Sequence, residues 1–552
     1  MKDKFLTKNM KYLGTGKEQI MCSEAEVIKA GKAVLGIEFG STRIKAVLVD
    51  PENRVIGLGT HDWENRLVDG LWTYTLEDIW GGLQDCYASL SADVQKRYGV
   101  VIEKLAAVGF SAMMHGYMAF GSDDELLIPF RTWRNTNTGK AAAALTKLFN
   151  FNMPMRWSTS HLYQCILDGM DHVRKVTYYT TLAGYITWAL TGNKVIGVGD
   201  AAGMFPIDPK TRDFDERMIG QFDELVKEYH YPWKLRDIMP KVLVAGQQAG
   251  TLTEKGARLL DVSGHLQAGV PVCPPEGDAG TGMVATNSCE VTTGNVSAGT
   301  SVFAMVVMKE NMKNLHTEID MVTTPDGAPV AMAHCNNCTS DLNAWVSIFR
   351  EFLEQMGIEP DMNKIFSVLY NHALDGDPDC GRVLAYNYYS GEPVTGFNGE
   401  GRPLLVRRPD SAFNLANFMR ANLYSSLASL KIGLDILLKE EHVELTRLMG
   451  HGGLFKTKGV AQRILAAAVD APVTVMDTAG EGGAWGMAVL AQYMIQKKMG
   501  RLFRSIWMAV CSPVRAEQPS AQRRRMLRAS TASSRCTRKD IRSSRLRSNR
   551  CK

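Results

Sequence analysis

The sequence lacks any long hydrophobic run, and its start lacks the apolar core of a secretory signal. No apolar segment approaches the roughly 18 residues that a membrane-spanning helix needs. The opening MKDKFLTKNMKYLGTGKEQ carries lysines but no apolar stretch, which excludes a secretory signal peptide. The eleven cysteines are odd in number and scattered, which favours reduced thiols over a disulfide framework. We therefore expect a cytoplasmic protein with no membrane partner.

Two common cofactor motifs are missing as well. Gly14–Lys17 has no earlier glycine at the required spacing and is followed by Glu18 instead of Ser or Thr, so it is not a Walker A loop. Cys335 and Cys338 form a Cys-x-x-Cys pair, but no second pair of ligands follows at a spacing that suits zinc. Thiols at a packed strand end are the alternative interpretation of this pair.

Positive charge is scarce in the body of the chain and concentrated at its end. Residues 501–552 hold 15 Lys+Arg and 2 Asp+Glu, so residues 1–500 carry a net charge of −8 although the whole chain carries +5. This Arg/Ser-rich segment loses all periodicity and predicts a disordered tail. It has no aromatic residue after Trp507 on which a base could stack, which argues against nucleic acid as a partner. We hypothesise that it is an out-of-frame or otherwise altered terminus.

The body begins with a strand–turn–strand pattern. An antiparallel meander is predicted by three apolar runs and the two turns between them, at 33–39, 40–42, 44–50, 51–53 and 54–60. Apolar residues at helical spacing follow from Leu76 to Leu90, and a short buried strand is expected at 105–110. Strands mixed with helices predict an α/β fold.

The second half repeats the opening hairpin about 258 residues later, counted from Ser41 to Gly299. Strand-like runs at 290–296 and 302–308 flank the small-residue turn 297–301. Two copies of one unit suggest two similar domains around a shared cleft, and coincidence between two common hairpins is the alternative. Near the end, a further set of elements is expected: strands at 444–449 and 472–476, a glycine-rich loop at 450–453, and helices at 457–469 and 484–494.

The two glycine-rich turns point to phosphate chemistry. Turns of this kind expose backbone N–H groups that can cradle phosphate oxygens, and two of them could hold one polyphosphate from both sides. Glu38, beside the first turn, could hold Mg²⁺ through water, and Lys45 lies in the following strand. Taken alone, each turn is weak evidence for phosphate binding, and an ordinary hairpin is the alternative interpretation.

Several strings occur in one order that resembles the FGGY carbohydrate kinases, a family of the actin/hexokinase ATPase superfamily. The similarity covers about residues 33–497 and is strongest toward pentulose kinases of the xylulokinase and ribulokinase kind. The strings are GIEFGSTRIKAVLVD, GFSAMMHGYMAF, PFRTWRNTNT, STSHLYQCIL, GDAAGMFPID, GDAGTGMVATNS, GNVSAGTSVF, YYSGEP and GHGG. The resemblance implies two actin-like, ribonuclease H-like domains flanking a cleft.

The resemblance also implies roles by position. ATP would be held by the first hairpin, the second hairpin and an adenosine loop, namely by Gly40, Ser41, Thr42, Lys45, Gly299, Thr300, Ser301, Gly452 and Gly453. Glu38 replaces the family's usual aspartate as the residue for Mg²⁺. Asp278 would take the proton from the sugar hydroxyl, since phosphoryl transfer needs positioning, charge neutralisation and one carboxylate aimed at the nucleophile. Asp200 is a rival carboxylate, for which we expect a structural role.

The sugar would be read by residues of the first domain. Met114 and His115 match the family's Gln-Met-His-Gly segment, in which Met113 replaces the Gln. Trp133, Arg134 and Asn135 match a Trp-Asn/Gln-Asp segment, with Asn135 where Asp is common. Asp278 completes the substrate-binding set.

The resulting expectation is an ATP- and Mg²⁺-dependent kinase for a small sugar, and it leaves room for a homodimer. A non-catalytic ATP-binding regulatory protein on the same fold is the alternative. The expected organisation is an N-terminal extension (1–32), a sugar-binding domain (33–286), a nucleotide-binding domain (287–500) and the basic tail (501–552).

Overall fold

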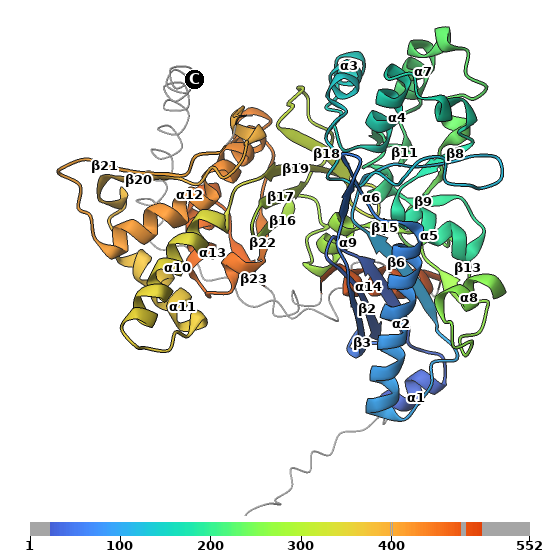
Figure 1. The fold of residues 1–552 in the computed structure, drawn as a ribbon, viewed down its shortest axis with the longest axis horizontal. Helices are drawn as coiled ribbons and strands as arrows, with labels where there is room; N and C mark the ends of the chain where they lie inside the picture. The colour runs from blue at the N-terminus through green and yellow to red at the C-terminus, as the bar shows by residue number, and fades with distance from the viewer. Residues whose placement is uncertain (1–22, 398, 400, 476–481, 499–552) are drawn as a thin grey trace, which may run out of the picture.

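The structure is a computed structural model that describes residues 23–397, 399, 401–475 and 482–498. The first 22 residues and the tail from 499 lie outside this range, so the predicted disorder and altered terminus of the tail stay predictions. Two mixed sheets form the centres of two lobes (Figure 1). No helix within the described ranges combines the length and apolarity needed to cross a bilayer.

The first sheet runs in the order β13-β14-β6-β1-β2-β3, with β15 also paired to β6. Its strands are β1 (Val34–Phe39), β2 (Arg43–Val49), β3 (Val55–Asp62), β6 (Ala107–Ala112), β13 (Gly250–Thr251), β14 (Pro271–Val272) and β15 (Glu276–Gly277). β1, β2 and β3 are antiparallel neighbours, as the meander predicted, whereas β6 runs parallel to β1. β14 and β15 run parallel to β6 in turn.

The second sheet runs in the order β18-β19-β17-β16-β22-β23. Its strands are β16 (Thr293–Ala298), β17 (Val302–Val307), β18 (Ile319–Thr323), β19 (Pro329–Cys335), β22 (Arg447–His451) and β23 (Val473–Val475). β19, β17 and β16 are antiparallel neighbours, and β22 and β23 continue the sheet in parallel with β16. The series β3-β2-β1-β6-β14 and β19-β17-β16-β22-β23 thus share one topology, so the repeated hairpin reflects a repeated domain.

The remaining elements surround the two sheets. The helices are α1 (Glu24–Lys29), α2 (Leu76–Tyr98), α3 (Gly139–Phe149), α4 (Ser158–Leu167), α5 (Leu182–Thr191), α6 (Val198–Ala201), α7 (Glu216–Leu225), α8 (Glu254–Leu260), α9 (Asp278–Ala285), α10 (Thr339–Gln355), α11 (Met362–His372), α12 (Leu415–Asp435), α13 (Val460–Val469) and α14 (Gly482–Lys498). Short strand pairs are β4 (Arg66–Val68) with β5 (Leu71–Thr73), β7 (Met118–Phe120) with β8 (Tyr178–Thr180), β9 (Val195–Gly197) with β12 (Lys241–Leu243), β10 (Ile207–Asp208) with β11 (Asp213–Phe214), and β20 (Val383–Tyr386) with β21 (Leu404–Arg407).

Three predicted boundaries in the second half were wrong by about three residues. The strand expected from residue 290 begins at Thr293, because Thr292 has a φ of 70° and the Thr293 N–H closes a turn onto the Glu290 carbonyl. The helix expected from residue 457 begins at Val460, after Gly459 with a φ of 84°. Residues 450 and 451, expected in a loop, instead extend β22, which spans Arg447–His451 rather than 444–449.

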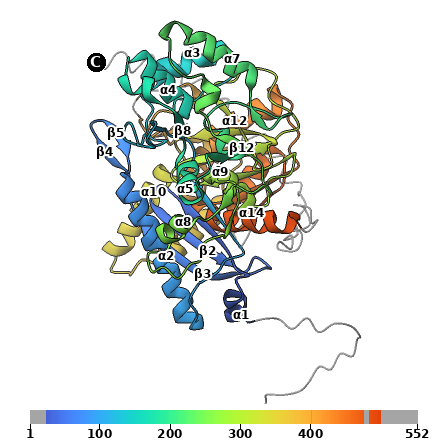
Figure 2. The same cartoon turned by 90° about the vertical axis from the view of Figure 1, so that its right-hand side faces the viewer.

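The last described helix, α14, packs on the first sheet although it follows β23 of the second (Figure 1). Its buried face joins Val34, Val47 and Cys273 in one hydrophobic cluster, and it also contacts α9. α2 covers the opposite face of β2 and β3 (Figure 2). The second half of the chain therefore completes the core of the first lobe.

Candidate active site

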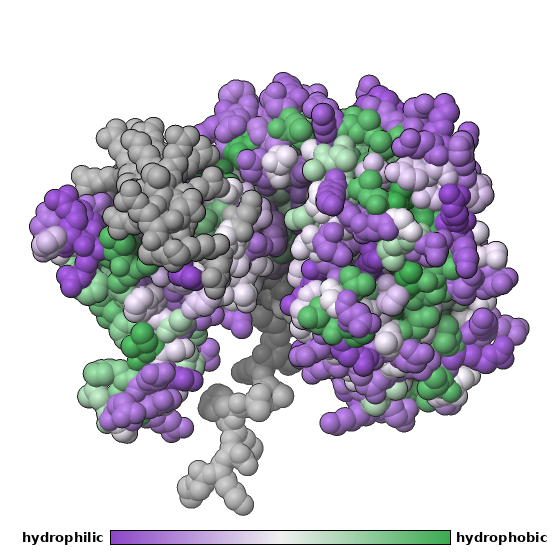
Figure 3. All heavy atoms as spheres, turned by 45° about the horizontal axis from the view of Figure 1, so that its top comes forward, coloured by the Kyte–Doolittle hydropathy of each residue, from purple (hydrophilic) through white to green (hydrophobic). Residues whose placement is uncertain are grey.

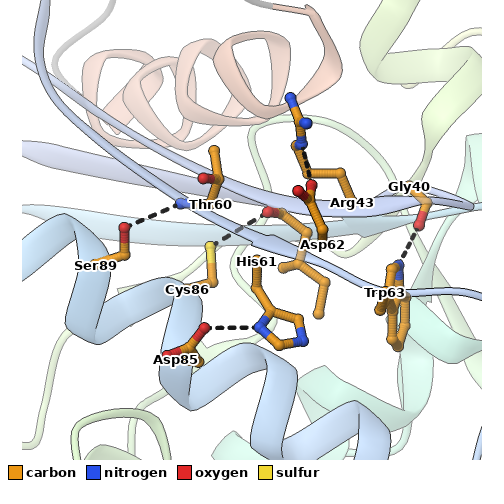
Figure 4. Close-up of polar contacts among 10 residues, drawn as sticks. Gly40, Arg43, Thr60, His61, Asp62, Trp63, Asp85, Cys86 and Ser89 are labelled. Atoms are coloured by element: carbon orange, nitrogen blue, oxygen red, sulfur yellow. Dashed lines mark hydrogen bonds and ion pairs between the residues drawn. The ribbon is translucent and has the colours of Figure 1, made fainter.

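Three aromatic side chains hold the turn of the first hairpin. Trp63 Nε1 donates to the Gly40 carbonyl at 2.7 Å (Figure 4), and Tyr74 OH donates to the Ser41 carbonyl at 2.7 Å. Trp133 Nε1 donates to Ser41 Oγ at 3.1 Å. The rings of Trp63 and Tyr74 stack at 4.0 Å. Because their carbonyls are engaged, the turn residues keep one shape, with the exposed Thr42 at the tip.

The hairpin is also braced from outside the turn (Figure 4). Arg43, the first residue of β2, forms an ion pair with Asp62 at 2.6 Å. His61 Nδ1 contacts Asp85 of α2 at 2.7 Å. Both pairs lie at the protein surface, so their energies are small, but they hold β2, β3 and α2 in one arrangement.

Glu38 lies two residues before Gly40 of this turn, where the second half of the chain meets the first sheet. It is paired with Lys45 across the hairpin, and its carboxyl faces the start of α14. Gly483 approaches so closely that a Cβ there would lie 1.9 Å from Glu38 Oε1, and the Ala484 amide interacts with the carboxyl. Burial and the nearby Asp278 raise the pKa of Glu38 to about 7.

Asp278 is the first residue of α9, directly after the parallel strand β15. Its Oδ1 accepts a hydrogen bond from the Met114 backbone N–H at 3.1 Å. The side chain is exposed to solvent, yet the surrounding protein raises its pKa, and backbone N–H donors oppose this effect. The structure thus places the predicted base and the predicted Mg²⁺ residue close enough to repel each other.

Two buried carboxyl groups lie behind Asp278. Asp200 Oδ2 accepts from Thr181 Oγ1 at 2.6 Å, whereas Asp200 Oδ1 has no partner among the described residues. Burial, together with the Asp278 charge, raises the pKa of Asp200 to about 7. Glu276 is 1% exposed, and burial and Asp200 hold its pKa well above the ordinary value. Asp200 is therefore buried, whereas Asp278 is exposed, and the structural role of Asp200 stays a prediction.

The predicted sugar-reading loop follows β6. Met114 and His115 are buried, and His115 has a φ of 70°, in the left-handed region. Its Nδ1–H donates to the Gly203 carbonyl at 3.3 Å, and its ring stacks on Trp157 at 6.4 Å. Burial and the neighbouring Arg156 hold the pKa of His115 well below the ordinary value, so the ring is neutral.

The three residues of the segment Trp133–Asn135 make different contacts in the structure. Trp133 is 36% exposed and contacts the first hairpin, as described above. Arg134 lies over the Trp72 ring at 3.7 Å. Asn135 is buried, with Oδ1 accepting from the Trp72 N–H at 2.9 Å and Nδ2 donating to the Trp72 carbonyl at 2.8 Å. Its amide thus fixes the β4–β5 hairpin, a contact the sequence pattern did not indicate.

The second hairpin and the predicted adenosine loop lie side by side in the second lobe. The carbonyls of Gly299 and Thr300 accept from the N–H groups of Thr339 and Cys338 at 3.1 and 3.0 Å. Ser297 of β16 is paired with residue 451 of β22. A Cβ on Gly452, which has a φ of 97°, would lie 2.5 Å from the Ala298 carbonyl oxygen. The loop at 452–453 therefore lies against the strand that leads into the second glycine turn.

Sequence reasoning missed the contacts that join the lobes. Arg156 forms an ion pair with Asp320 of β18, and Asn152 Nδ2 donates to the same carboxylate at 3.0 Å. Thr323 Oγ1 donates to the Val198 carbonyl at 3.0 Å. Figure 3 shows the surface hollowed between the two lobes. These partners are more than 100 residues apart, so no local pattern signals them.

The residues present fit a Mg²⁺ ion that also binds phosphate and water. Within the described ranges, no three His, Cys, Asp or Glu side chains gather as a metal site of their own. Mg²⁺ is commonly held by one or two carboxylates together with substrate phosphates. Glu38, whose raised pKa reflects burial and a second carboxylate, has the matching oxygen donors.

Two lobes with one shared strand order, each with a glycine hairpin, define a mixed α/β fold of two similar domains, the fold of solved carbohydrate kinases. The profile of the N-terminal domain of the FGGY family of carbohydrate kinases matches residues 33–285, and that of the C-terminal domain matches residues 294–495. The chain therefore belongs to the FGGY family of carbohydrate kinases.

Individual relatives are distant. A xylulose kinase from Lactococcus lactis is 20% identical over 437 residues, which are 76% of this chain and 80% of the relative. The chain spans about half the length, 47% and 51%, of two other curated relatives. The structure of a ligand-bound xylulose kinase from Lactobacillus acidophilus superposes with a TM-score of 0.76 at 16% identity, covering 92% of this chain and 98% of that one. A Plasmodium falciparum glycerol kinase with ADP gives 0.70 at 14% identity, covering 91% and 97%.

Proposed function

We propose that the protein transfers the γ-phosphoryl group of ATP to a terminal hydroxyl of a sugar, with a ketopentose such as xylulose or ribulose as substrate. The observation that carries this proposal is the solvent-open Asp278 carboxylate, held by the Met114 N–H beside Glu38. Xylulose kinases among the relatives and fold neighbours support the sugar class. The ADP-bound glycerol kinase of the same fold supports the nucleotide.

In the proposed mechanism, the sugar lies between the loop at 114–115, Trp133 and Asp278. An Asp278 carboxylate oxygen accepts the proton of the terminal sugar hydroxyl while the hydroxyl oxygen attacks the γ-phosphorus. The bond between the γ-phosphorus and the oxygen that bridges the β- and γ-phosphates breaks. ADP and the sugar phosphate then leave. The Met114 N–H donates to Oδ1 and holds the carboxylate in place for this role.

The nucleotide would lie between the two hairpins. Backbone N–H groups of residues 40–42 and 299–301 would hold the phosphates, and the open backbone at 452–453 would lie against the purine. When bound, Mg²⁺ would be held by Glu38 through water and would neutralise charge on the β- and γ-phosphates. The position of Lys45 opposite Glu38 in the hairpin suits a phosphate contact as well.

The test is a coupled ADP-release assay over a panel of ketoses and polyols, with the full chain and Asp278→Asn. We expect sugar-dependent ADP release from the wild type and a loss of at least about 10³-fold in the variant, with ATP affinity nearly unchanged. Asp375→Asn, at an exposed carboxylate beside His372, is the matched control. Near-normal turnover by Asp278→Asn would refute the assignment of the base. ATP binding without any sugar-dependent turnover would instead favour the non-catalytic alternative.

A further inference from the structure

A buried arginine behind the sugar-reading loop has no oxygen acceptor for its side chain among the residues that the structure describes. Arg131 is 5% exposed, and its backbone exchanges hydrogen bonds with Tyr117, which fixes its place. The hydrogen-bond partners of its guanidinium within the described ranges are sulfur atoms, with Nη1 3.2 Å from Cys165 Sγ and Nη2 3.4 Å from Met170 Sδ. Nε has no partner in the described part of the chain. Sulfur is a weak acceptor, so these contacts do not replace the hydration that burial removes.

A second buried arginine shows how this fold otherwise accommodates such a group. Arg420 is 4% exposed, and its Nε donates to Tyr424 OH at 3.1 Å. Its Nη1 has three carbonyl acceptors, those of Ala373, Leu374 and Gly376 at 3.4, 3.2 and 2.7 Å. Oxygen atoms thus stabilise the charge of Arg420, whereas the Arg131 guanidinium has no oxygen acceptor among the described residues.

Four titratable neighbours of Arg131 are neutral, and the Asp168 carboxylate, which acts on Cys165, instead accepts from Gln164 Nε2 at 2.9 Å. Burial, together with Arg131 itself, lowers the pKa of His161 to about 3 and that of His172 to about 4, so both rings are neutral. Burial raises the pKa of Cys165 to about 11 and holds that of Tyr117 well above its ordinary value. No carboxylate of the described residues forms an ion pair with Arg131. An uncompensated buried guanidinium costs several kcal/mol, which calls for a counter-charge.

Unused donors lie on the face of α4 that packs against Arg131. Trp157, His161 and Cys165 follow one another at spacings of four residues and so share one face of the helix. Opposite them, Tyr117 stacks on His161 at 6.3 Å, and Arg131 contacts Cys165. Both ring nitrogens of His161 and the Trp157 indole N–H have no partner among the described residues, and both side chains are fully buried.

We propose that Arg131 and His161 form a buried binding site for a small monovalent inorganic anion of the halide class. The guanidinium supplies the charge, and Nε and one imidazole N–H supply hydrogen bonds. The anion stands where an Asp or Glu would otherwise be required. The Tyr117 ring stacks on His161, and the Trp157 ring stacks on His115 of the sugar-reading loop.

The first experiment is thermal unfolding of the full chain at constant ionic strength, with sodium methanesulfonate replaced stepwise by sodium chloride. We expect the wild-type midpoint to rise by about 2 °C or more, since an anion that binds only the folded state stabilises it. Arg131→Met should have a midpoint independent of chloride. Arg97→Met, at a half-exposed arginine that pairs with Asp93, is the control and should keep the wild-type response.

The second experiment uses the wild type alone, so it does not depend on whether the variant folds. Crystals grown in sodium bromide should show an anomalous peak within about 3.5 Å of the Arg131 guanidinium. A bromide peak together with a chloride-dependent midpoint supports the site. Absence of a peak at Arg131, or equal wild-type midpoints in chloride and methanesulfonate, would overturn the proposal.

Discussion

Asp200→Asn should change the pH dependence of stability in a predictable direction. The carboxyl is 1% exposed, and its pKa rises from an ordinary 3.8 to about 7 in the folded protein. In the unfolded chain the group loses its proton near pH 4, whereas the folded protein keeps it until about pH 7. Between these values the folded state binds more protons, so stability falls as the pH rises.

The size of this effect follows from the shift. A difference of about 3 pKa units at about 1.4 kcal/mol each gives up to about 4 kcal/mol lost between pH 4 and pH 8. Asparagine cannot ionise, and its carbonyl still accepts from Thr181 Oγ1. The free energy of unfolding of the variant should therefore equal that of the wild type at pH 4. It should exceed the wild-type value by a margin that grows with pH and reaches about 2–4 kcal/mol at pH 8.

Urea unfolding at pH 4, 6 and 8, followed by intrinsic fluorescence, measures the difference at each pH. Asp375→Asn, at an exposed carboxyl, should show no such trend and serves as the control. A difference between wild type and Asp200→Asn that is the same at pH 4 and pH 8 would show that Asp200 ionises normally in the folded protein. The argument for a buried neutral carboxyl behind Asp278 would then fail.

Three further predictions concern the proposed reaction. Because the pKa of Glu38 is raised to about 7 and that of Asp278 is raised as well, kcat/KM should increase as the pH rises through about 7 and Glu38 loses its proton, and a flat profile would contradict this. Gly483→Ala should lower kcat/KM for MgATP by about tenfold or more, because its Cβ would displace Glu38. Gly282→Ala, with open space at its Cβ, is the control. Equal kcat/KM values for Gly483→Ala and the wild type in a steady-state assay would count against the role of Glu38. Gly452→Ala should raise the KM for ATP about tenfold with little change in the KM for sugar, whereas Gly220→Ala, outside the site and with open space at its Cβ, should change neither; a sugar-specific defect would argue against the adenosine loop.

The sequence by itself determined the local elements and the order of the motifs. Alternating apolar residues and small turn residues select strands and hairpins through short-range backbone preferences, so β1–β3 and the glycine turns at 40–42 and 299–301 were predictable. Boundaries that depend on one left-handed residue, such as Thr292 or Gly459, were displaced because side-chain pattern does not specify φ.

Which distant residues share an environment depends on how the chain folds. The fold brings the start of α14 against Glu38, more than 440 residues away in the chain, and places Glu276 beside Asp200. It also leaves Arg131 facing sulfur rather than oxygen. A carboxyl or guanidinium has the same sequence signature whether it is solvated or buried. Its charge state depends on the segments that exclude water from it, and those segments meet only in the folded protein.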